Sequence, residues 1–230
     1  MKLKKTKGLV ISFLKYRETS IIVRIFTRDL GLKSYIVNGV RSKGAKSKMA
    51  FYQPLTQLDM VVYDKEGASL NRISEVKLAK AYEKIPFDFQ RSSIAMFMGE
   101  VLGKSIYDDY QNESFYDFLE YSLDQLDKES VILVHFPLVF LWECSKYLGF
   151  APNDAASFFD ELTDEAYHPG QLKEEIDYLN ALIEESFACN QKVHAIHRKK
   201  LLDHFLMFYS RHLESPYEWK SVKVLRQLLG

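Results

Sequence analysis

The sequence has few of the features that mark a secreted, membrane-embedded or metal-bound protein. Only two of its 230 residues are cysteines, Cys144 and Cys189, and they do not form a Cys-x-x-Cys pair. A disulfide framework and a zinc site built from thiolates are therefore both excluded, and we expect buried or half-buried thiols in a reducing compartment. No hydrophobic run is long enough to cross a bilayer, and the basic start lacks a small-residue cleavage site. We expect a cytoplasmic protein that does not associate with membranes.

Motifs for nucleotide hydrolysis, dinucleotide binding and serine hydrolysis are absent as well. His194 and His197 are spaced to share one face of a helix, but the surrounding residues are basic, which favours a solvated or partner-facing pair over a metal site. The carboxylate pair Asp108-Asp109 has no nucleophile or base nearby in sequence, which is typical of solvated charge. We therefore expect no catalysis, no cofactor and no bound metal.

The formal net charge is zero, but this neutrality is a cancellation between regions. Residues 1–48 contain 13 Lys and Arg against 2 Asp and Glu, whereas residues 83–190 contain 6 against 22. Residues 191–230 are basic again, with 8 against 3. Such asymmetry indicates a module that binds a polyanion, joined to a second module of different character.

The stretch from Gly31 to Lys48 concentrates this basic character. It begins as an alternating strand, passes through the turn dipeptide Asn38-Gly39, and continues as a loop with four cations among Ser, Gly and Ala. Because the cations are two to three residues apart and their neighbours are small, they can follow successive phosphates of a nucleic acid. The alternative is a solvated loop that only keeps the protein soluble.

Five short runs with an apolar period of two precede residue 80, and each is predicted to be a strand. They centre on residues 9–14, 21–26, 32–37, 58–63 and 72–77. Five strands with tight connections in about seventy residues suit the five-stranded oligonucleotide-binding (OB) barrel. A five-stranded sandwich is the alternative that the pattern leaves open. We expect an α+β protein in which residues 1–80 form the OB-fold domain.

Residues 81–230 are predicted to form an all-α domain, because the apolar period changes to 3.6 after Leu78. Helices are expected over residues 94–106, 114–126, 133–148, 171–187, 195–213 and 221–229. Ser114 and Asp117 resemble a capping box, Pro137 must lie in a first turn or cause a kink, and Gly149 ends a helix. Residues 150–170 are expected to form a long connection.

Ordered segments along the chain resemble the RecO family of bacterial recombination mediators. In the predicted barrel they are Gly8-Leu9-Val10-Ile11, Tyr16-Arg17-Glu18-Thr19-Ser20, Phe26-Thr27, Gly31, Gly39-Val40-Arg41-Ser42-Lys43 and Gln53-Pro54-Leu55-Thr56. The likeness continues through Leu148-Gly149-Phe150-Ala151-Pro152 and Lys220-Ser221-Val222-Lys223-Val224-Leu225-Arg226, so it covers nearly the whole chain. It implies an OB barrel joined to a helical domain.

The resemblance also implies a function and partners. RecO-like proteins bind single- and double-stranded DNA and anneal strands coated with single-stranded-DNA-binding protein (SSB). They work with RecR, and often with RecF, to load RecA at gaps. Many relatives carry a four-cysteine zinc element after the Gly-Tyr/Phe-Ala-Pro segment, but residues 153–159 here contain no cysteine. Zinc should be absent, and packing alone must replace what that element contributes.

We expect a cationic, phosphate-binding face on the barrel, with aromatic side chains as candidates for base stacking. The candidate DNA-binding residues are Lys15, Arg17, Arg24, Arg28, Lys33, Tyr35, Arg41, Lys43, Lys46 and Lys48. Tyr16, Phe51 and Tyr52 are further stacking candidates, and for each aromatic a place in the core is the alternative. Strand annealing requires free bases, so contacts to phosphates should dominate over stacking.

The acidic tail of SSB, which ends in an aromatic residue, needs an apolar groove with a cationic rim. The basic carboxyl-terminal region is the candidate, with Arg198, Lys199, Lys200, Arg211, Lys220 and Arg226. The alternative is that these cations balance the acidic helices. Two other functions fit the same sequence: an RNA-binding OB-fold protein, and a non-catalytic adaptor whose acidic helices are the interacting surface.

Overall fold

The computed structural model describes residues 2–42, 46–65, 67–162, 172–213 and 218–228, with the side chains of Lys46 and Ser47 outside this set. The chain divides into two compact units that do not simply follow chain order. The barrel unit contains residues 1–83 and 101–121, and the helical unit contains residues 84–100 and 122–230. None of the helices in the described ranges is both long and apolar enough to cross a membrane.

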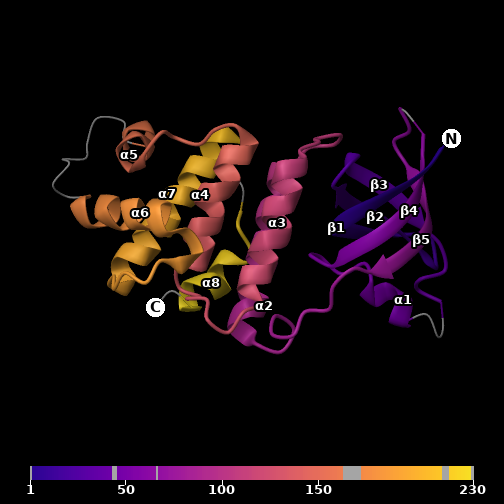
Figure 1. Ribbon diagram of the computed structural model, residues 1–230, viewed down its shortest axis with the longest axis horizontal. Helices are drawn as coiled ribbons and strands as arrows, with labels where there is room; N and C mark the ends of the chain where they lie inside the picture. Colours follow the sequence, from indigo (N-terminus) through magenta and orange to yellow (C-terminus); the bar gives the residue numbers. More distant parts are fainter. Residues whose placement is uncertain (1, 43–45, 66, 163–171, 214–217, 229–230) are drawn as a thin grey trace. The chain divides into compact units, whose positions relative to one another are not determined.

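The barrel unit is built on a closed five-stranded barrel (Figure 1). Its strands are β1 (Lys2–Tyr16), β2 (Ser20–Thr27), β3 (Gly31–Val37), β4 (Gln57–Asp64) and β5 (Asn71–Leu78). They follow the order β1-β2-β3-β5-β4 around the barrel, and only the β3–β5 pairing is parallel. The predicted OB barrel is confirmed, and the open sandwich is ruled out.

Strand β1 is long because it pairs with β4 along its first half and with β2 along its second half. Gly8 is the corner residue, aligned with both Thr27 and Leu58. A Cβ atom at Gly8 would lie 2.5 Å from Met60 Cε and 2.6 Å from Ile25 Cγ2, so only glycine fits there. A bulge after Val10 adds to the bend, and together these features let one strand close the barrel.

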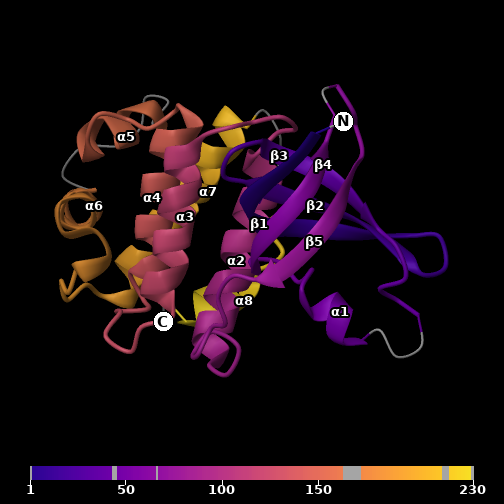
Figure 2. The ribbon, with the colours of Figure 1, turned by 45° about the vertical axis from the view of Figure 1, so that its right-hand side comes forward.

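The barrel interior is filled by alternating side chains from every strand, among them Val10, Val23, Ile25 and Leu58. One end of the barrel is closed by the chain between β3 and β4, because Val40 and Tyr52 belong to the same buried cluster. This connection includes the short helix α1 (Lys46–Ala50), which lies at that end in Figure 2. The sequence predicted a loop here, and the structure adds the helix.

The remaining chain is helical, as predicted. The helices are α2 (Phe89–Ser105), α3 (Glu113–Leu126), α4 (Phe136–Leu148), α5 (Ala155–Leu162), α6 (Lys173–Glu185), α7 (Ala195–His212) and α8 (Val222–Leu228), with a 3-10 turn η2 (Ser186–Ala188). Pro137 lies in the first turn of α4, where its missing N–H costs nothing, and Gly149 ends that helix with a φ of 85°. The positions of Pro137 in the first turn and of Gly149 at the helix end are both as the sequence predicted.

Helix α5 lies in the stretch that was predicted to be a long connection, so that prediction was wrong for residues 155–162. Asp154 caps the helix by accepting hydrogen bonds from the backbone N–H and the hydroxyl of Ser157. Phe158 is fully buried, and its ring lies 4.7 Å from that of Phe205 and 5.0 Å from that of Phe208. Aromatic packing therefore holds α5 in place.

Candidate nucleic-acid interface

The predicted DNA-binding cations fall into two groups in the structure. Lys15, Arg17, Arg41 and Lys48 are exposed, and no ion pair within the described ranges involves any of them. Arg24, Arg28 and Lys33 are paired with carboxylates from residues 108–117. Lys43 lies outside the described residues, and so does the side chain of Lys46.

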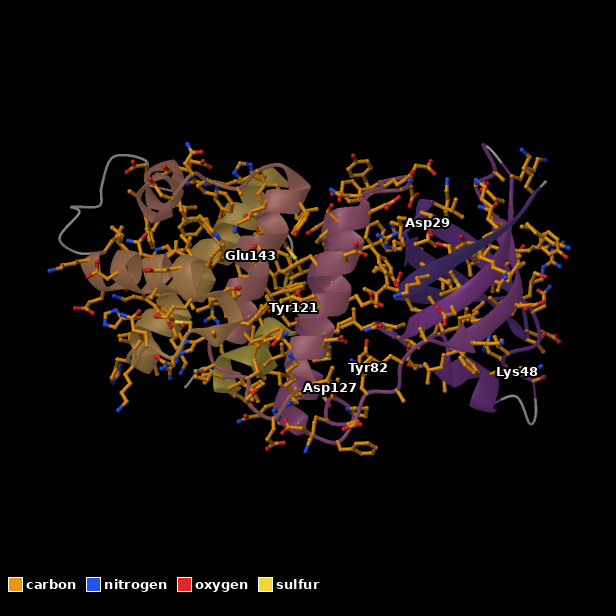
Figure 3. The ribbon with its side chains drawn as sticks, in the orientation of Figure 1. Asp29, Lys48, Tyr82, Tyr121, Asp127 and Glu143 are labelled. Atoms are coloured by element: carbon orange, nitrogen blue, oxygen red, sulfur yellow. The ribbon has the colours of Figure 1, made fainter. Side chains whose placement is uncertain are left out.

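The first group gathers on segments that meet at one end of the barrel. Lys15 and Arg17 belong to the β1–β2 hairpin, where Arg17 takes a left-handed φ of 51°. The backbone N–H of Arg41 donates to the carbonyl of Thr19 at 3.0 Å, and the Arg41 guanidinium donates to the Arg17 carbonyl at 3.2 Å. Lys48 stands on α1, whose following residues close this end of the barrel (Figure 3).

We define these four cations, Lys15, Arg17, Arg41 and Lys48, as the hairpin-end cluster. Ser20 and Asn38 tie the β1–β2 hairpin to the chain that follows β3 by a side-chain hydrogen bond of 2.9 Å. The hydrogen bond between Arg41 and the Arg17 carbonyl brings these two residues together, and none of the four cations forms an ion pair within the described ranges. Such a surface attracts phosphate groups and carries no information about base sequence.

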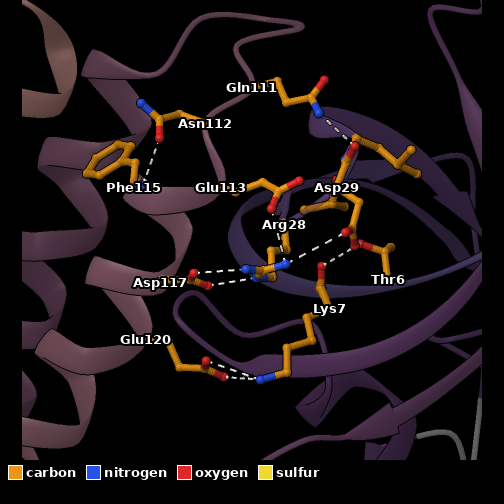
Figure 4. A network of polar contacts seen from close by, with 12 residues as sticks. Thr6, Lys7, Arg28, Asp29, Gln111, Asn112, Glu113, Phe115, Asp117 and Glu120 are labelled. Atoms are coloured by element: carbon orange, nitrogen blue, oxygen red, sulfur yellow. Dashed lines mark hydrogen bonds and ion pairs between the residues drawn. The ribbon is translucent and has the colours of Figure 1, made fainter.

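The second group is neutralised within the barrel unit, as Figure 4 shows for Arg28. The Arg28 guanidinium forms a two-pronged pair with Asp117, at 2.7 and 2.9 Å, and lies 3.3 Å from Glu113. The hydrogen bonds and charge of Asp117 raise the pKa of Arg28, and Arg28 in turn lowers the pKa of the Asp117 carboxyl. Arg28 is thus part of an ion-pair network and not of an open cationic face.

Three further pairs extend this pattern. Lys7 pairs with Glu120 at 2.9 Å, Arg24 with Asp108 at 3.1 Å, and Lys33 with Asp109 at 2.5 Å. Sequence reasoning interpreted Asp108-Asp109 as solvated charge and so missed their partners. The opposite charges of residues 1–48 and 83–190 were the signal that could have found these pairs, because unlike charges in one chain attract each other.

Tyr35 does not suit base stacking in this structure. Only 1% of its surface is exposed, because the ring fills the barrel core beside Val23 on the neighbouring strand, and burial raises the pKa of its phenol. Tyr52 is buried too, at 3%, and Phe51 is half-buried against the same core. Tyr16 is also half-buried, with the Arg17 guanidinium 5.2 Å from its ring centroid. The core alternative therefore holds for Tyr35 and Tyr52.

The predicted capping box at the start of α3 is wrong. The helix begins at Glu113, and the Asn112 side chain, not Ser114, accepts the capping hydrogen bond, from the Phe115 N–H at 2.9 Å. Asp117 is consequently free of a capping role and pairs with Arg28.

In the helical unit, several of the six cations proposed for the SSB tail contact carbonyls or carboxylates of the protein. Arg211 donates to the carbonyls of Glu161 and Leu162 at the end of α5, Lys200 lies 3.6 Å from Glu175, and Arg226 pairs with Asp203. Within the described part of the chain, the side chains of Lys199 and Lys220 form no ion pair. These contacts support the alternative that several of these cations balance acidic residues.

Arg198 lines a cavity of the helical unit. The cavity has a volume of about 440 Å³ and is lined by Ile132, Val134, His135, Asn190, Gln191, Lys192, Val193, His194 and Arg198. Its walls combine aliphatic side chains with two cations and two imidazoles, which is the chemistry expected for an acidic ligand with an apolar end. The contribution of Ile132 and Val134 was not predicted, because they precede α4 in sequence by only a few residues and form no motif.

His194 and His197, which the sequence places on one helix face, both make contacts within the protein. His194 caps α7 by accepting a hydrogen bond from Ile196 N–H at 3.3 Å, and His197 lies 3.1 Å from the buried carboxylate of Glu175. Within the described ranges, no group of three or more His, Cys, Asp or Glu side chains is arranged to hold a metal ion. Burial raises the pKa of the Cys144 thiol well above its usual value.

The closed barrel with its exposed cations, followed by an all-helical unit, defines an OB-fold protein with a helical second module. The family model described as "Recombination protein O N terminal" matches residues 1–82, and the one described as "Recombination protein O C terminal" matches residues 86–221. The chain belongs to the RecO family.

Relatives from other bacteria align along nearly the whole chain. The protein of Flavobacterium psychrophilum named DNA repair protein RecO is 37% identical, over 98% of this chain and 99% of its own length. The protein of the same name from Flavobacterium johnsoniae is 36% identical over the same shares. That of Phocaeicola vulgatus is 32% identical over 99% of this chain and all of its own length.

Proposed function

We propose that this chain is a non-catalytic DNA repair and recombination mediator. In this proposal it binds single- and double-stranded DNA, anneals complementary strands, and helps RecR to load RecA on SSB-coated gaps, with RecF as an additional partner. Membership of the RecO family and the names of its relatives support the role in DNA repair. The finer steps rest on the geometry of the barrel and on the family resemblance.

The hairpin-end cluster is the observation that carries the DNA-binding part of the proposal. Its four cations have no carboxylate partner within the described ranges, whereas Arg24, Arg28 and Lys33 do. Exposed cations bind phosphates with the release of counterions, which gives affinity without sequence preference. Of the aromatic stacking candidates, Tyr35 and Tyr52 are buried, and Tyr16 and Phe51 are half-buried. Bases would therefore stay free to pair, as annealing requires.

The first prediction concerns charge reversal in this cluster. Arg41→Glu combined with Lys48→Glu should weaken binding of a fluorescent single-stranded oligonucleotide by about a hundredfold or more at low salt, because two phosphate contacts are replaced by repulsion. Fluorescence anisotropy measures the affinity, and thermal unfolding checks that the barrel stays folded.

A charge-matched control separates local contact from net charge. Lys173→Glu combined with Lys223→Glu makes the same change in net charge at two exposed lysines of the helical unit. We expect this control to bind DNA like the unaltered protein. Equal affinity of the Arg41/Lys48 variant and the control would remove the site. Stronger competition by RNA than by DNA of equal length would instead favour an RNA-binding role.

Within this proposal, the tail of SSB docks in the cavity beside Arg198. Two cations, Lys192 and Arg198, stand on its rim, while Ile132 and Val134 offer apolar surface for a terminal aromatic ring. Arg198 is held in place by donating to the Val193 carbonyl, so its charge is directed by the loop that leads into α7. This location keeps one of the six cations proposed from the sequence and replaces the others.

The second prediction tests this location. Arg198→Gln combined with Lys192→Gln should weaken binding of a synthetic acidic peptide that ends in phenylalanine by about tenfold, because the peptide carboxylates lose two charge-assisted contacts. Lys199→Gln combined with Lys220→Gln removes the same charge outside the cavity and should leave the affinity unchanged. If the two variants bind the peptide equally well, the cavity is not the docking site.

A further inference from the structure

Residues 106–112, which connect α2 to α3, cover the part of the barrel surface formed by β2 and the start of β3. The Asp109 N–H donates to the Leu32 carbonyl at 3.2 Å, and the Leu32 N–H donates to the Tyr110 carbonyl at 2.9 Å. These two bonds pair the backbone N–H and carbonyl of Leu32, which β5 does not reach, since β5 pairs with β3 only at Tyr35 and Ile36. The connection thus extends the sheet at an otherwise open edge.

The close packing of this connection against β3 depends on Gly31. Its φ is +72°, and a Cβ atom there would lie 2.5 Å from the Tyr110 carbonyl oxygen. A residue with a side chain would therefore be strained by its own backbone and would also push the connection away. The close approach of residues 109–110 to β3 is consequently built into the sequence.

Aromatic packing fixes the same connection from the other side. The ring of Tyr110 stacks on Phe26 of β2 with centroids 6.0 Å apart, and Phe115 of α3 packs on Phe26 at 5.8 Å. Phe26 is fully buried by this cover. The backbone of the connection therefore stays in place, because its departure would expose Phe26 to water.

The carboxylates of this connection, in contrast, lie largely in solvent. The side chains of Asp108 and Asp109 are 80% and 77% exposed, whereas their partners Arg24 and Lys33 are 29% and 24% exposed. Rotation about the aspartate side-chain bonds is enough to break both ion pairs, and exposed pairs of this kind contribute little stability. Arg24 would keep its hydrogen bond to the Ile106 carbonyl, at 3.3 Å, and so remain positioned on the surface.

We propose that Arg24 and Lys33 form a second phosphate-binding site on the barrel, for which Asp108 and Asp109 compete as internal anions. This inference rests on the proposed DNA-binding function and refines it. A phosphodiester chain displaces the two aspartate side chains and takes their places on the cations, so part of its binding free energy is offset by the ion pairs that it replaces. The two aspartates thereby keep affinity for DNA low enough for release after annealing.

The experiment removes the two competing charges without changing side-chain shape. Asp108→Asn combined with Asp109→Asn should raise affinity for a fluorescent single-stranded oligonucleotide by about tenfold at low salt, because two cations become available to phosphates. The slope of log affinity against log salt should steepen by about 1.4, at about 0.7 per phosphate contact on single strands. Asparagine tolerates the left-handed φ of 64° at Asp109, so the backbone should be preserved.

Two controls make the outcome specific. Adding Arg24→Gln and Lys33→Gln to the double variant should return affinity to that of the unaltered protein. Asp177→Asn combined with Glu184→Gln, at exposed residues of α6, makes the same change in net charge and should have no effect.

The possible failures are distinguishable. If the unaltered protein binds DNA through the hairpin-end cluster but Asp108→Asn with Asp109→Asn leaves affinity and salt slope unchanged, this inference alone is overturned. It is also overturned if the variant with all four substitutions keeps the higher affinity for DNA. If neither the unaltered protein nor the double variant binds DNA, the proposed function fails together with this inference.

Discussion

Two histidines of the helical unit are held in their neutral form by burial. His135 is 5% exposed, and its Nδ1 lies 2.6 Å from the hydroxyl of Tyr178. Burial, and then the charge of Arg198, lower the pKa of His135 below its usual 6.5. Burial likewise lowers the pKa of His204, in spite of the opposite effect of Glu175. Protonation of either ring is therefore less favourable in the folded protein than in the unfolded chain.

The lower pKa of these two histidines in the folded protein leads to a prediction about stability and pH. Since the folded-state pKa of both histidines lies below 6.5, the unfolded chain binds more protons as the pH falls past 6.5. The stability due to the neutral rings is complete above that value and is lost below it. We expect the thermal unfolding temperature to decrease as the pH is lowered from about 7.5 to about 5.5, a range that spans the usual histidine pKa.

A control variant and the choice of pH range separate the contribution of the histidines from that of the carboxylates. His135→Gln cannot be protonated, so it should flatten the decline even if it lowers the midpoint at neutral pH. Glu175, whose pKa is lowered from 4.5 by His197 and Lys200 against the effect of burial, contributes stability that is lost only at lower pH. A midpoint in the unaltered protein that stays constant down to about pH 5.5 would contradict the assignment.

At the scale of the elements, the strands and most helices could be predicted because their apolar periods are regular. Strands β1 to β5 and helices such as α4 and α7 lie where the periods of two and 3.6 place them, with ends shifted by a few residues. Helix α5 was missed because it has only eight residues and lies in a stretch between prolines. A two-turn helix has too few apolar positions to establish a period.

The orientation of side chains on β2 and β3 could not be predicted, and this decided which cations are available. The outward residue Phe26 is apolar because residues 106–116 cover it, so both faces of β2 resemble a core face in the sequence. A strand covered on both sides loses the alternation from which exposure is inferred. For that reason Tyr35 could be interpreted as either a core residue or a stacking residue.

The pairing of Arg24, Arg28 and Lys33 was missed for a related reason. Their partners are about eighty to ninety residues away in the chain, and no local pattern records a contact at that separation. Only the regional charge totals pointed to it. The loop cations of the candidate site were easier to find, because Arg41 and Lys48 flank residues 42–47, where Ser, Gly and Ala alternate with lysines.

At the scale of the whole molecule, a net charge of zero conceals a barrel with a basic hairpin end and an acidic set of helices. Charges on a protein surface act over only about 8 Å at physiological salt. Binding of DNA should therefore depend on the cations that touch phosphates and not on the total charge of the chain. This distinction separates a specific polyanion site from general electrostatic attraction.

The last prediction tests that distinction with two variants that change the net charge in opposite directions. Lys15→Gln combined with Lys48→Gln lowers the net charge by two and should reduce DNA affinity about tenfold at about 0.15 M salt, with the salt slope reduced by about 1.4. Asp177→Asn combined with Glu184→Gln raises the net charge by two and should leave both quantities unchanged, because these exposed carboxylates of α6 influence phosphates only through screened solvent. Anisotropy titrations over a series of salt concentrations measure both slopes. Equal and opposite shifts in the two variants would mean that total charge governs binding, and the hairpin-end cluster would then have no special role.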